Sequence, residues 1–259
     1  MRLVTWNIHG GFGRDGRHDL SRVAALLEEM RCDVAALQEV GGHGSHPEAE
    51  LADHAAWLGR RLGWFVAYGP NLVLRGHPYG NAVLSRFPIA HARNYDLSIA
   101  NREPRGCLRV DLSLPEGRSL HLFDLHLGLS GVERRRQAAM LFSADLLRDT
   151  ALAAPLVLCG DFNIWSPLPG PIFRLLRSAL RDAAAVAGTR RATYPSVLPL
   201  LRLDRAYVDA GVDVLGCGVM NDSRTRAASD HLPLWVDLTT RGPALERIAP
   251  GVAVGKPGA

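Results

Sequence analysis

The chain has 259 residues, 47% of them hydrophobic, which is enough for a large core in one domain of sandwich or barrel size. Its 30 Lys and Arg residues against 26 acids give a net charge of +4, too small to establish nucleic-acid binding. No apolar stretch is long enough to cross a bilayer, and the first run, residues 2–6, is too short for a secretory signal. We therefore expect a cytoplasmic protein with no transmembrane segment.

The first third of the chain predicts two helices among short strands. Apolar residues between Leu20 and Met30 recur at helical spacing after Asp19, a residue type that often caps helix N-termini. A second helix is expected over Leu51 to Leu62. Strands are expected over residues 2–6, 34–37, 64–68 and 82–84.

The remainder is richer in strand signals. Residues 107–114 and 120–125 form an expected hairpin, joined by a turn at Pro115, Glu116 and Gly117. A long amphipathic helix is expected over Glu133 to Arg148 and a short one near Ile172 to Leu176. Further strands are expected over residues 156–159, 203–208, 212–219 and 232–238. About ten strands are too many for one open sheet, so we predict two stacked sheets flanked by helices over residues 1–240.

Two further features bear on the state of the chain. Residues 241–259 mix Gly, Pro, Ala and isolated charges without a period, which predicts a flexible tail outside the fold. The four cysteines are far apart, with no CxxC pair or histidine partner, and are expected to be reduced and buried: Cys32, Cys107, Cys159 and Cys217.

Seven short polar clusters each stand at the end of an apolar run. They are Trp6-Asn7, Gln38-Glu39, Gly80-Asn81, His126, Gly160 to Asn163, Leu203 to Arg205, and Ser229 to His231. Carboxylates gathered at strand ends repel one another unless a cation compensates them. Oxygen donors without a Cys cluster or an HExxH motif favour Mg²⁺ or Mn²⁺ over zinc. Taken singly, each cluster also has an ordinary interpretation: Glu39 could end a strand, Asp204 could pair with Arg205, and His126 could be a core histidine.

In order, these clusters resemble the motifs of the endonuclease/exonuclease/phosphatase superfamily, which includes DNase I-like nucleases, sphingomyelinases and inositol phosphate phosphatases. The resemblance covers residues 1–240 and suggests a poorly characterised bacterial branch. The motifs that carry it span residues 5–9, 37–40, 80–86, 124–127, 159–163, 203–205 and 229–233. It implies a DNase I-like α/β (α+β) four-layer sandwich with two mixed sheets, and hydrolysis of a phosphodiester with Mg²⁺ or Mn²⁺.

The resemblance also implies roles for eight residues. Glu39 would be the main metal ligand, with Asn7 and Asp230 beside it. Asp161 would position or deprotonate the attacking water, and Asn163 would bind a phosphoryl oxygen. Three further residues complete the implied site: His126 near the phosphate and leaving group, His231 as phosphate contact or base, and Asp204 orienting the ring of His231. Whether Asp161 or His231 takes the proton stays open, as does the number of metal ions.

The sequence indicates the type of bond that is hydrolysed more clearly than the substrate that contains it. His9 stands where abasic-site endonucleases of the superfamily carry an Asp, which argues against that branch. Arginines beside aromatics in the loops favour a nucleic-acid substrate, with a lipid head group or small phosphoester as the alternative and a non-catalytic binding protein as a remote one. The loops are residues 40–50, 71–79, 101–106, 164–171 and 189–201, contributing Arg75, Arg102, Arg105, Arg190, Arg191, Tyr79, Trp165 and Tyr194. No protein partner is predicted.

Overall fold

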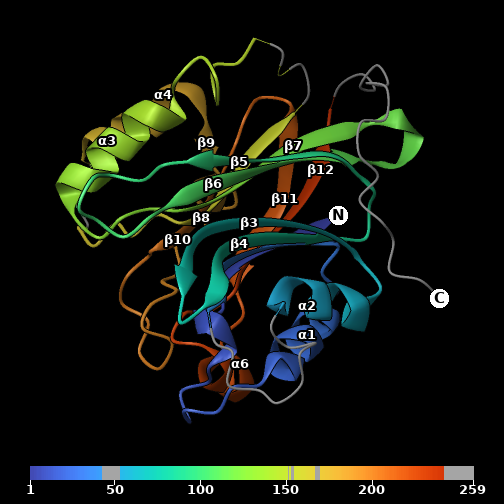
Figure 1. Cartoon of the computed structure of the whole chain (residues 1–259). Helices are drawn as coiled ribbons and strands as arrows, with labels where there is room; N and C mark the ends of the chain where they lie inside the picture. The colour runs from blue at the N-terminus through green and yellow to red at the C-terminus, as the bar shows by residue number, and fades with distance from the viewer. Residues whose placement is uncertain (43–52, 151, 153–154, 167–169, 242–259) are drawn as a thin grey trace.

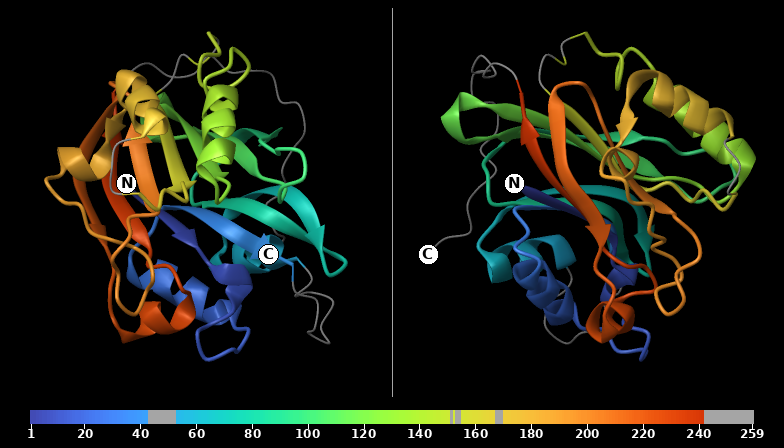
Figure 2. Two further views of the ribbon diagram at one scale, coloured as in Figure 1. Left: turned by 90° about the vertical axis from the view of Figure 1, so that its left-hand side faces the viewer. Right: turned by 180° about the vertical axis from the view of Figure 1, so that it is seen from behind.

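The computed structural model describes residues 1–42, 53–150, 152, 155–166 and 170–241. Within them, two six-stranded sheets stack face to face, with helices on their outer faces (Figures 1 and 2). The first sheet has the order β11 (Val212–Val219), β12 (Leu234–Thr240), β1 (Arg2–Asn7), β2 (Val34–Gly41), β4 (His77–Ser85) and β3 (Phe65–Leu74). The second has the order β5 (Ile89–Asp96), β6 (Gly106–Ser113), β7 (Ser119–His126), β8 (Leu156–Asp161), β10 (Asp204–Val208) and β9 (Arg181–Asp182).

Both sheets are mixed, which confirms the predicted four-layer α/β architecture. Strand β1 is parallel to β2, and β7 is parallel to β8, while the other pairs are antiparallel. Side chains alternate along β1, so that Leu3 enters the core between the sheets while Val4 and Trp6 pack toward the helices. Three hydrophobic clusters therefore separate the four layers.

The main helices cover the outer faces of the sheets. Helices α1 (Leu20–Glu29) and α2 (His54–Leu62) pack on the first sheet, and α3 (Gly131–Leu141) and α4 (Pro171–Ala179) pack on the second. Two short helices connect consecutive strands: α5 (Ala183–Val186) lies between β9 and β10, and α6 (Ser223–Ala228) lies between β11 and β12. Asp19 caps α1 as predicted, because its carboxylate accepts a hydrogen bond from the Ser21 N–H.

Several predicted boundaries are wrong. The helix expected over Glu133 to Arg148 begins at Gly131 and ends at Leu141, and the following segment continues as turns. Ser143 and Asp145, which compete for backbone hydrogen bonds, disfavour its extension. Leu146 is buried nonetheless. The predicted start of the second helix, residues 51–52, lies outside the described residues, as does most of the tail; of the tail only Arg241 is described.

The segment expected as a loop over residues 71–79 is instead the end of a hairpin. Strands β3 and β4 meet at Arg75 and Gly76, which both have positive φ (51° and 86°), the backbone that a two-residue hairpin turn requires. Pro70 and Pro78 in the sequence disfavour strands here. In the structure, a register shift next to Pro70 accommodates that residue within β3. Strand β5 was also not predicted, because it is a polar edge strand with mostly exposed residues.

The cysteine prediction holds for burial and pairing. All four cysteines are buried and free. None of the helices in the described part of the chain combines the length and apolar character needed to cross a membrane.

Candidate active site

The predicted site residues come together because parallel strands end at one edge of each sheet. Asn7 ends β1 beside Gln38 of β2, and His126 ends β7 beside Asp161 of β8. Asp204 begins the antiparallel strand β10 directly opposite Asp161. Since the two sheets stack, both sets of strand ends lie on the same side of the molecule.

The backbone at this edge is irregular where a side chain must be redirected. Glu39 has φ +58° and lies in a bulge of β2, where the register with β4 shifts between Leu37 and Val40. Asn163, just after β8, has φ +49°. Left-handed backbone at non-glycine residues is strained, and two such residues at one site are typical of functional positions. Gly160 has φ +134°, and a Cβ there would lie 1.9 Å from the carbonyl oxygen of Leu125.

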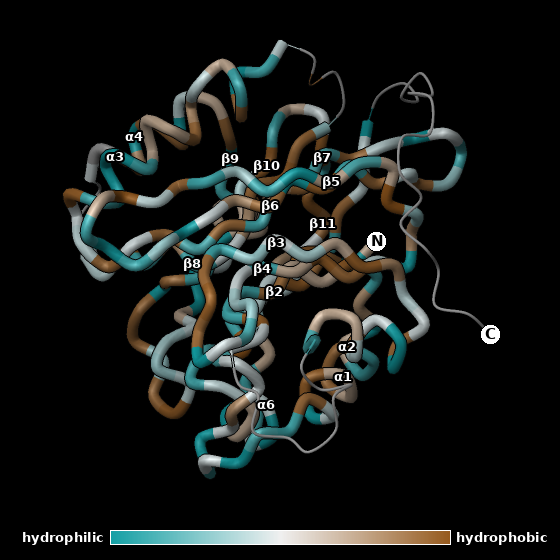
Figure 3. The backbone as a smooth tube through the Cα atoms, in the orientation of Figure 1, coloured by the Kyte–Doolittle hydropathy of each residue, from teal (hydrophilic) through white to brown (hydrophobic). Residues whose placement is uncertain are grey.

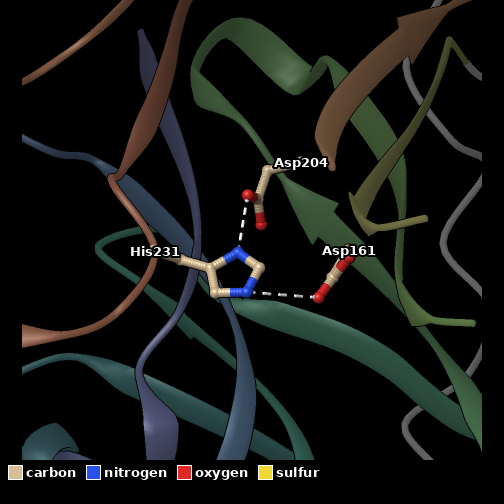
Figure 4. A group of neighbouring side chains, drawn as sticks. All are labelled: Asp161, Asp204 and His231. Atoms are coloured by element: carbon tan, nitrogen blue, oxygen red, sulfur yellow. Dashed lines mark hydrogen bonds and ion pairs between the residues drawn. The ribbon is translucent and has the colours of Figure 1, made fainter. Parts of the chain in front are cut away.

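Asp204, His231 and Asp161 form a linked series (Figure 4). Nδ1 of His231 lies 2.8 Å from Oδ2 of Asp204, and Nε2 of the same ring lies 3.8 Å from Oδ2 of Asp161. All three side chains are buried. Burial lowers the pKa of His231, but the charge and hydrogen bond of Asp204, with Asp161 and Asp230, raise it to about 10. Burial and the neighbouring Asp204 raise the pKa of Asp161 to about 6.

These three side chains offer atoms close enough together to suggest a metal group. The short contact between His231 and Asp204 takes up only Nδ1, because a ring nitrogen that donates to a carboxylate has no lone pair for an ion; Nε2 and the carboxylates remain as possible donors. The carboxylate of Asp204 also orients the ring, so that the other nitrogen points at Asp161. The arrangement is that of an oriented histidine facing a reaction site.

His126 lies on the other side of Asp161, with Nε2 at 3.5 Å from Oδ2. The amide nitrogen of Asn163 lies 3.1 Å from the same ring nitrogen and donates to the Leu127 carbonyl at 2.9 Å. Arg105 Nη1 approaches the ring at 3.0 Å from Nδ1. Burial, Arg105 and His231 hold the pKa of His126 well below its usual value, so its ring is neutral.

Asn7 connects the two carboxylates of the site. Its amide nitrogen donates to Glu39 Oε1 at 2.9 Å and to Asp161 Oδ2 at 3.2 Å, while its oxygen accepts from the His9 N–H at 3.1 Å. Asn7 and Asp161 are buried, whereas Glu39 is half-buried. The amide thus fixes the spacing of Glu39 and Asp161.

Most of these groups line one cavity of about 470 Å³, while the buried Asn7 and Asp204 contact it through Glu39, Asp161 and His231. Among the described residues, its charged wall consists of Glu39, Glu103, Asp161 and Asp230 with one arginine, Arg105, and with His126 and His231. Its apolar and aromatic wall consists of Leu72, Leu74, Tyr79, Leu129, Trp165, Tyr194 and Leu203. Tyr194 packs against the ring of His231 at 4.8 Å and against Trp165 at 5.4 Å between ring centroids.

The predicted rim residues divide into two groups. Tyr79, Arg105, Trp165 and Tyr194 line the cavity. The other four arginines are exposed and lie outside its wall: Arg75, Arg102, Arg190 and Arg191. Most of the loop over residues 40–50, and residues 167–169 of another, lie outside the described residues.

Arg105 is the residue whose place the sequence did not reveal. It was expected at a nucleic-acid surface, but its side chain is buried against His126 and paired at 3.2 Å with the exposed Glu103. Its Nε has no hydrogen-bond partner. The only sequence signal was its position directly before Gly106, at the start of a strand.

Other cluster residues support the site from behind. The amide nitrogen of Asn81 donates to the carbonyls of Gly106 and Asp124, which joins the first sheet to the second. Gln38 donates to the carboxyl of Asp124 across the same interface. Burial raises the pKa of Asp124 well above its usual value, so this carboxyl is neutral and can lie in the core.

This fold and this site match a known class of protein. A model of the endonuclease/exonuclease/phosphatase family matches residues 4–231, and the chain belongs to that family, whose members are phosphoester hydrolases. The chain is 32% identical over 245 residues to the Escherichia coli protein YbhP, itself uncharacterized, covering 92% of this chain and 96% of YbhP. The predicted membership in a poorly characterised bacterial branch is confirmed.

Solved structures show the same DNase I-like fold. An endonuclease/exonuclease/phosphatase from Beutenbergia cavernae superposes with a TM-score of 0.76 at 24% identity, covering 93% of this chain and 72% of that chain. A mannosyl-6-phosphatase from Bacteroides thetaiotaomicron superposes with a TM-score of 0.74 at 19% identity, covering 92% and 99%. At these identities the likeness establishes the fold, and the substrate has to be argued from the site.

Proposed function

We propose that this chain hydrolyses a phosphodiester bond with the help of Mg²⁺ or Mn²⁺, by attack of water on phosphorus. One observation carries the proposal: the carboxylate of Asp161 lies between Nε2 of His126 and Nε2 of His231, in the cavity that Glu39 also lines. A base or positioning carboxylate, two imidazoles and a separate acidic group are the parts that metal-assisted phosphoester hydrolysis needs.

The oxygen donors around Glu39 fit a hard divalent cation. Glu39, Asp161 and Asp230 face one cavity, and the repulsion among three carboxylates is relieved when a cation binds between them. We assign the ion to Glu39, Asn7 and Asp230; Asn7 already holds Glu39 through its amide nitrogen. When bound, the ion would neutralise phosphoryl oxygens and stabilise the leaving oxygen.

The chain's own groups would then act on the substrate directly. Asp161 accepts a hydrogen bond from the water that attacks phosphorus and positions it. His231, oriented by Asp204, directs Nε2 toward the phosphoryl group. Asn163 and His126 lie on the opposite side, where the Asn163 amide would exchange its contact with His126 for a phosphoryl oxygen and His126 faces the leaving group.

The cavity wall bears on the substrate. Its apolar side chains favour a phosphoester that carries an apolar group, such as a lipid head group with its chains. A polar substrate would leave these apolar side chains exposed to water. A nucleic-acid substrate is the second candidate, and the Trp165 and Tyr194 pair, which could stack on a base, favours it. We also propose that the protein works in the cytoplasm, since its four buried free thiols suit a reducing compartment.

The test is hydrolysis of bis(p-nitrophenyl) phosphate by the wild type and by Asp161→Ala, with Mg²⁺, with Mn²⁺ and with EDTA. We expect turnover only with metal, and a fall of roughly 10² to 10⁴ in the variant, the range for one acid–base or positioning group. Wild-type turnover by Asp161→Ala would remove Asp161 from the reaction. Activity that survives EDTA would remove the metal.

A further inference from the structure

Exposed apolar side chains lie on segments that also contribute residues to the wall of the cavity. Most large apolar side chains that are exposed in the described part of the chain lie on or beside loops that also supply the cavity wall: Leu129, Val132, Trp165, Val197, Leu198 and Leu200. We call these six residues the apolar rim. Single exposed apolar residues are ordinary on a protein surface, but several of them on the segments that bound a binding cavity indicate an interaction site.

The rim is anchored to the site on two sides. The loop that carries Val197, Leu198 and Leu200 is closed by the pairing of Tyr194 with Leu201, and the Tyr194 ring contacts His231. This loop is orange in Figure 1 and contains strongly hydrophobic stretches in Figure 3. On the other side, Leu129 lines the cavity while remaining 59% exposed. Leu198 and Leu200 are 65% and 71% exposed.

The segments that supply the cavity wall, and those next to them in sequence, carry an excess of positive charge. Arg75, Arg102, Arg190 and Arg191 are exposed, and the guanidinium of Arg134 donates to the carbonyls of Gly128 and Leu129 at the mouth. Within residues 75–76, 97–105, 127–132 and 187–203, Glu103 is the single acidic residue. Apolar side chains accompanied by arginines are complementary to a surface in which a negatively charged layer covers an apolar one.

We infer that the apolar rim docks on the surface of an anionic phospholipid membrane, with the cavity facing the head groups; this rests on the proposed function for the site itself. In that orientation Leu198, Leu200 and Leu129 enter the acyl boundary and the arginines meet lipid phosphates. Aliphatic side chains gain little from nucleic-acid bases, which stack on aromatic rings, so the leucines favour a lipid surface over a nucleic acid. The proposal makes the substrate a phosphoester presented at a membrane.

The test measures binding without turnover. Full-length protein in EDTA is sedimented with vesicles of equimolar phosphatidylcholine and phosphatidylglycerol, and with vesicles of phosphatidylcholine alone. The test variant is Leu198→Ser/Leu200→Ser. The matched control is Leu215→Ser, which changes a leucine that is 70% exposed on β11, away from the cavity. Thermal midpoints and hydrolysis of bis(p-nitrophenyl) phosphate are measured for all three proteins.

We expect the double variant to bind mixed vesicles ~100-fold more weakly, about tenfold for each leucine removed from the acyl boundary. The control should bind like the wild type, and phosphatidylcholine alone should bind more weakly than the mixture. Binding that is insensitive to the two leucines or to the anionic lipid overturns the inference, as does rim-dependent binding to single-stranded DNA or RNA without vesicle binding. Loss of p-nitrophenyl diester hydrolysis in every protein would instead count against the proposed function, so the two failures are distinguishable.

Discussion

Replacing Asp204 by Asn tests whether this buried carboxylate acts only by orienting His231. The change keeps the size of the side chain but removes the charge that faces Nδ1 of His231 at 2.8 Å. A hydrogen bond to a charged group contributes about 1.5 to 3 kcal/mol, which corresponds to roughly 10- to 150-fold in rate if it is lost in the transition state. If the new amide nitrogen turns toward His231 and inverts its tautomer, the loss approaches the ~10² to 10⁴ of the whole histidine.

The stability effect can be separated from the rate effect. Oδ1 of Asp204 is buried without a hydrogen-bond partner, so the amide nitrogen introduced by Asp204→Asn would be a buried donor in the same position and cost about 1 to 3 kcal/mol. The thermal midpoint should therefore fall by several degrees. Asp182→Asn is the matched control, because Asp182 is also buried and pairs with Arg202 at 2.6 Å, away from the cavity. It should lower the midpoint and leave kcat unchanged.

The assay is a double-mutant cycle with steady-state hydrolysis of bis(p-nitrophenyl) phosphate in saturating Mg²⁺. Because Asp204 acts through His231, Asp204→Asn should lower kcat with little change in KM, and it should have almost no further effect when His231 is already Gln. Two results would refute the reasoning: wild-type kcat in Asp204→Asn, or losses that multiply in the double variant.

Three further predictions concern the metal, Arg105 and a distant buried pair. Glu39→Gln should raise the Mg²⁺ concentration for half-maximal activity at least ~10-fold with an unchanged urea midpoint, because only the ligand charge is removed; an unchanged metal titration would contradict the assignment. Arg105→Gln should lower kcat/KM by roughly 10- to 100-fold, since the arginine charge in the cavity wall, which would attract an anionic phosphoester, is removed, and equal activity would show that Arg105 is structural. Burial raises the pKa of Asp111, but hydrogen bonds from His121 and Arg109 lower it below its usual range. The ionised carboxylate therefore stabilises the folded protein fully above its unfolded pKa of about 3.9, and this stabilisation is lost as pH falls through the lower folded pKa. The stabilities of wild type and Asp111→Asn, from urea unfolding, should therefore differ at pH 7 and converge in acid; a constant difference would exclude this linkage.

Some structural features could not be predicted from the sequence, because they depend on contacts with residues far away in the chain. Strand β5 is polar and mostly exposed, and it exists through its ladder with β6. The end of α3 at Leu141 depends on how the next turns pack, since Leu146 is buried without being helical. Local patterns report periodicity, and these two segments have no periodicity that reveals their tertiary partners.

The sequence by itself determined the family, the two-sheet architecture and the residues at the strand ends, because apolar runs and in-order polar motifs are local signals. The proximity of Asn7, Asp161, Asp204 and His231 could be inferred only through the resemblance, and their hydrogen bonds are now explicit. Tertiary structure alone decided that Arg105 is buried against His126 and that separate loops with exposed apolar side chains contribute to the wall of one cavity. The physical reason is that burial and neighbouring charge are properties of the packed chain, set by loops whose sequences have no regular pattern.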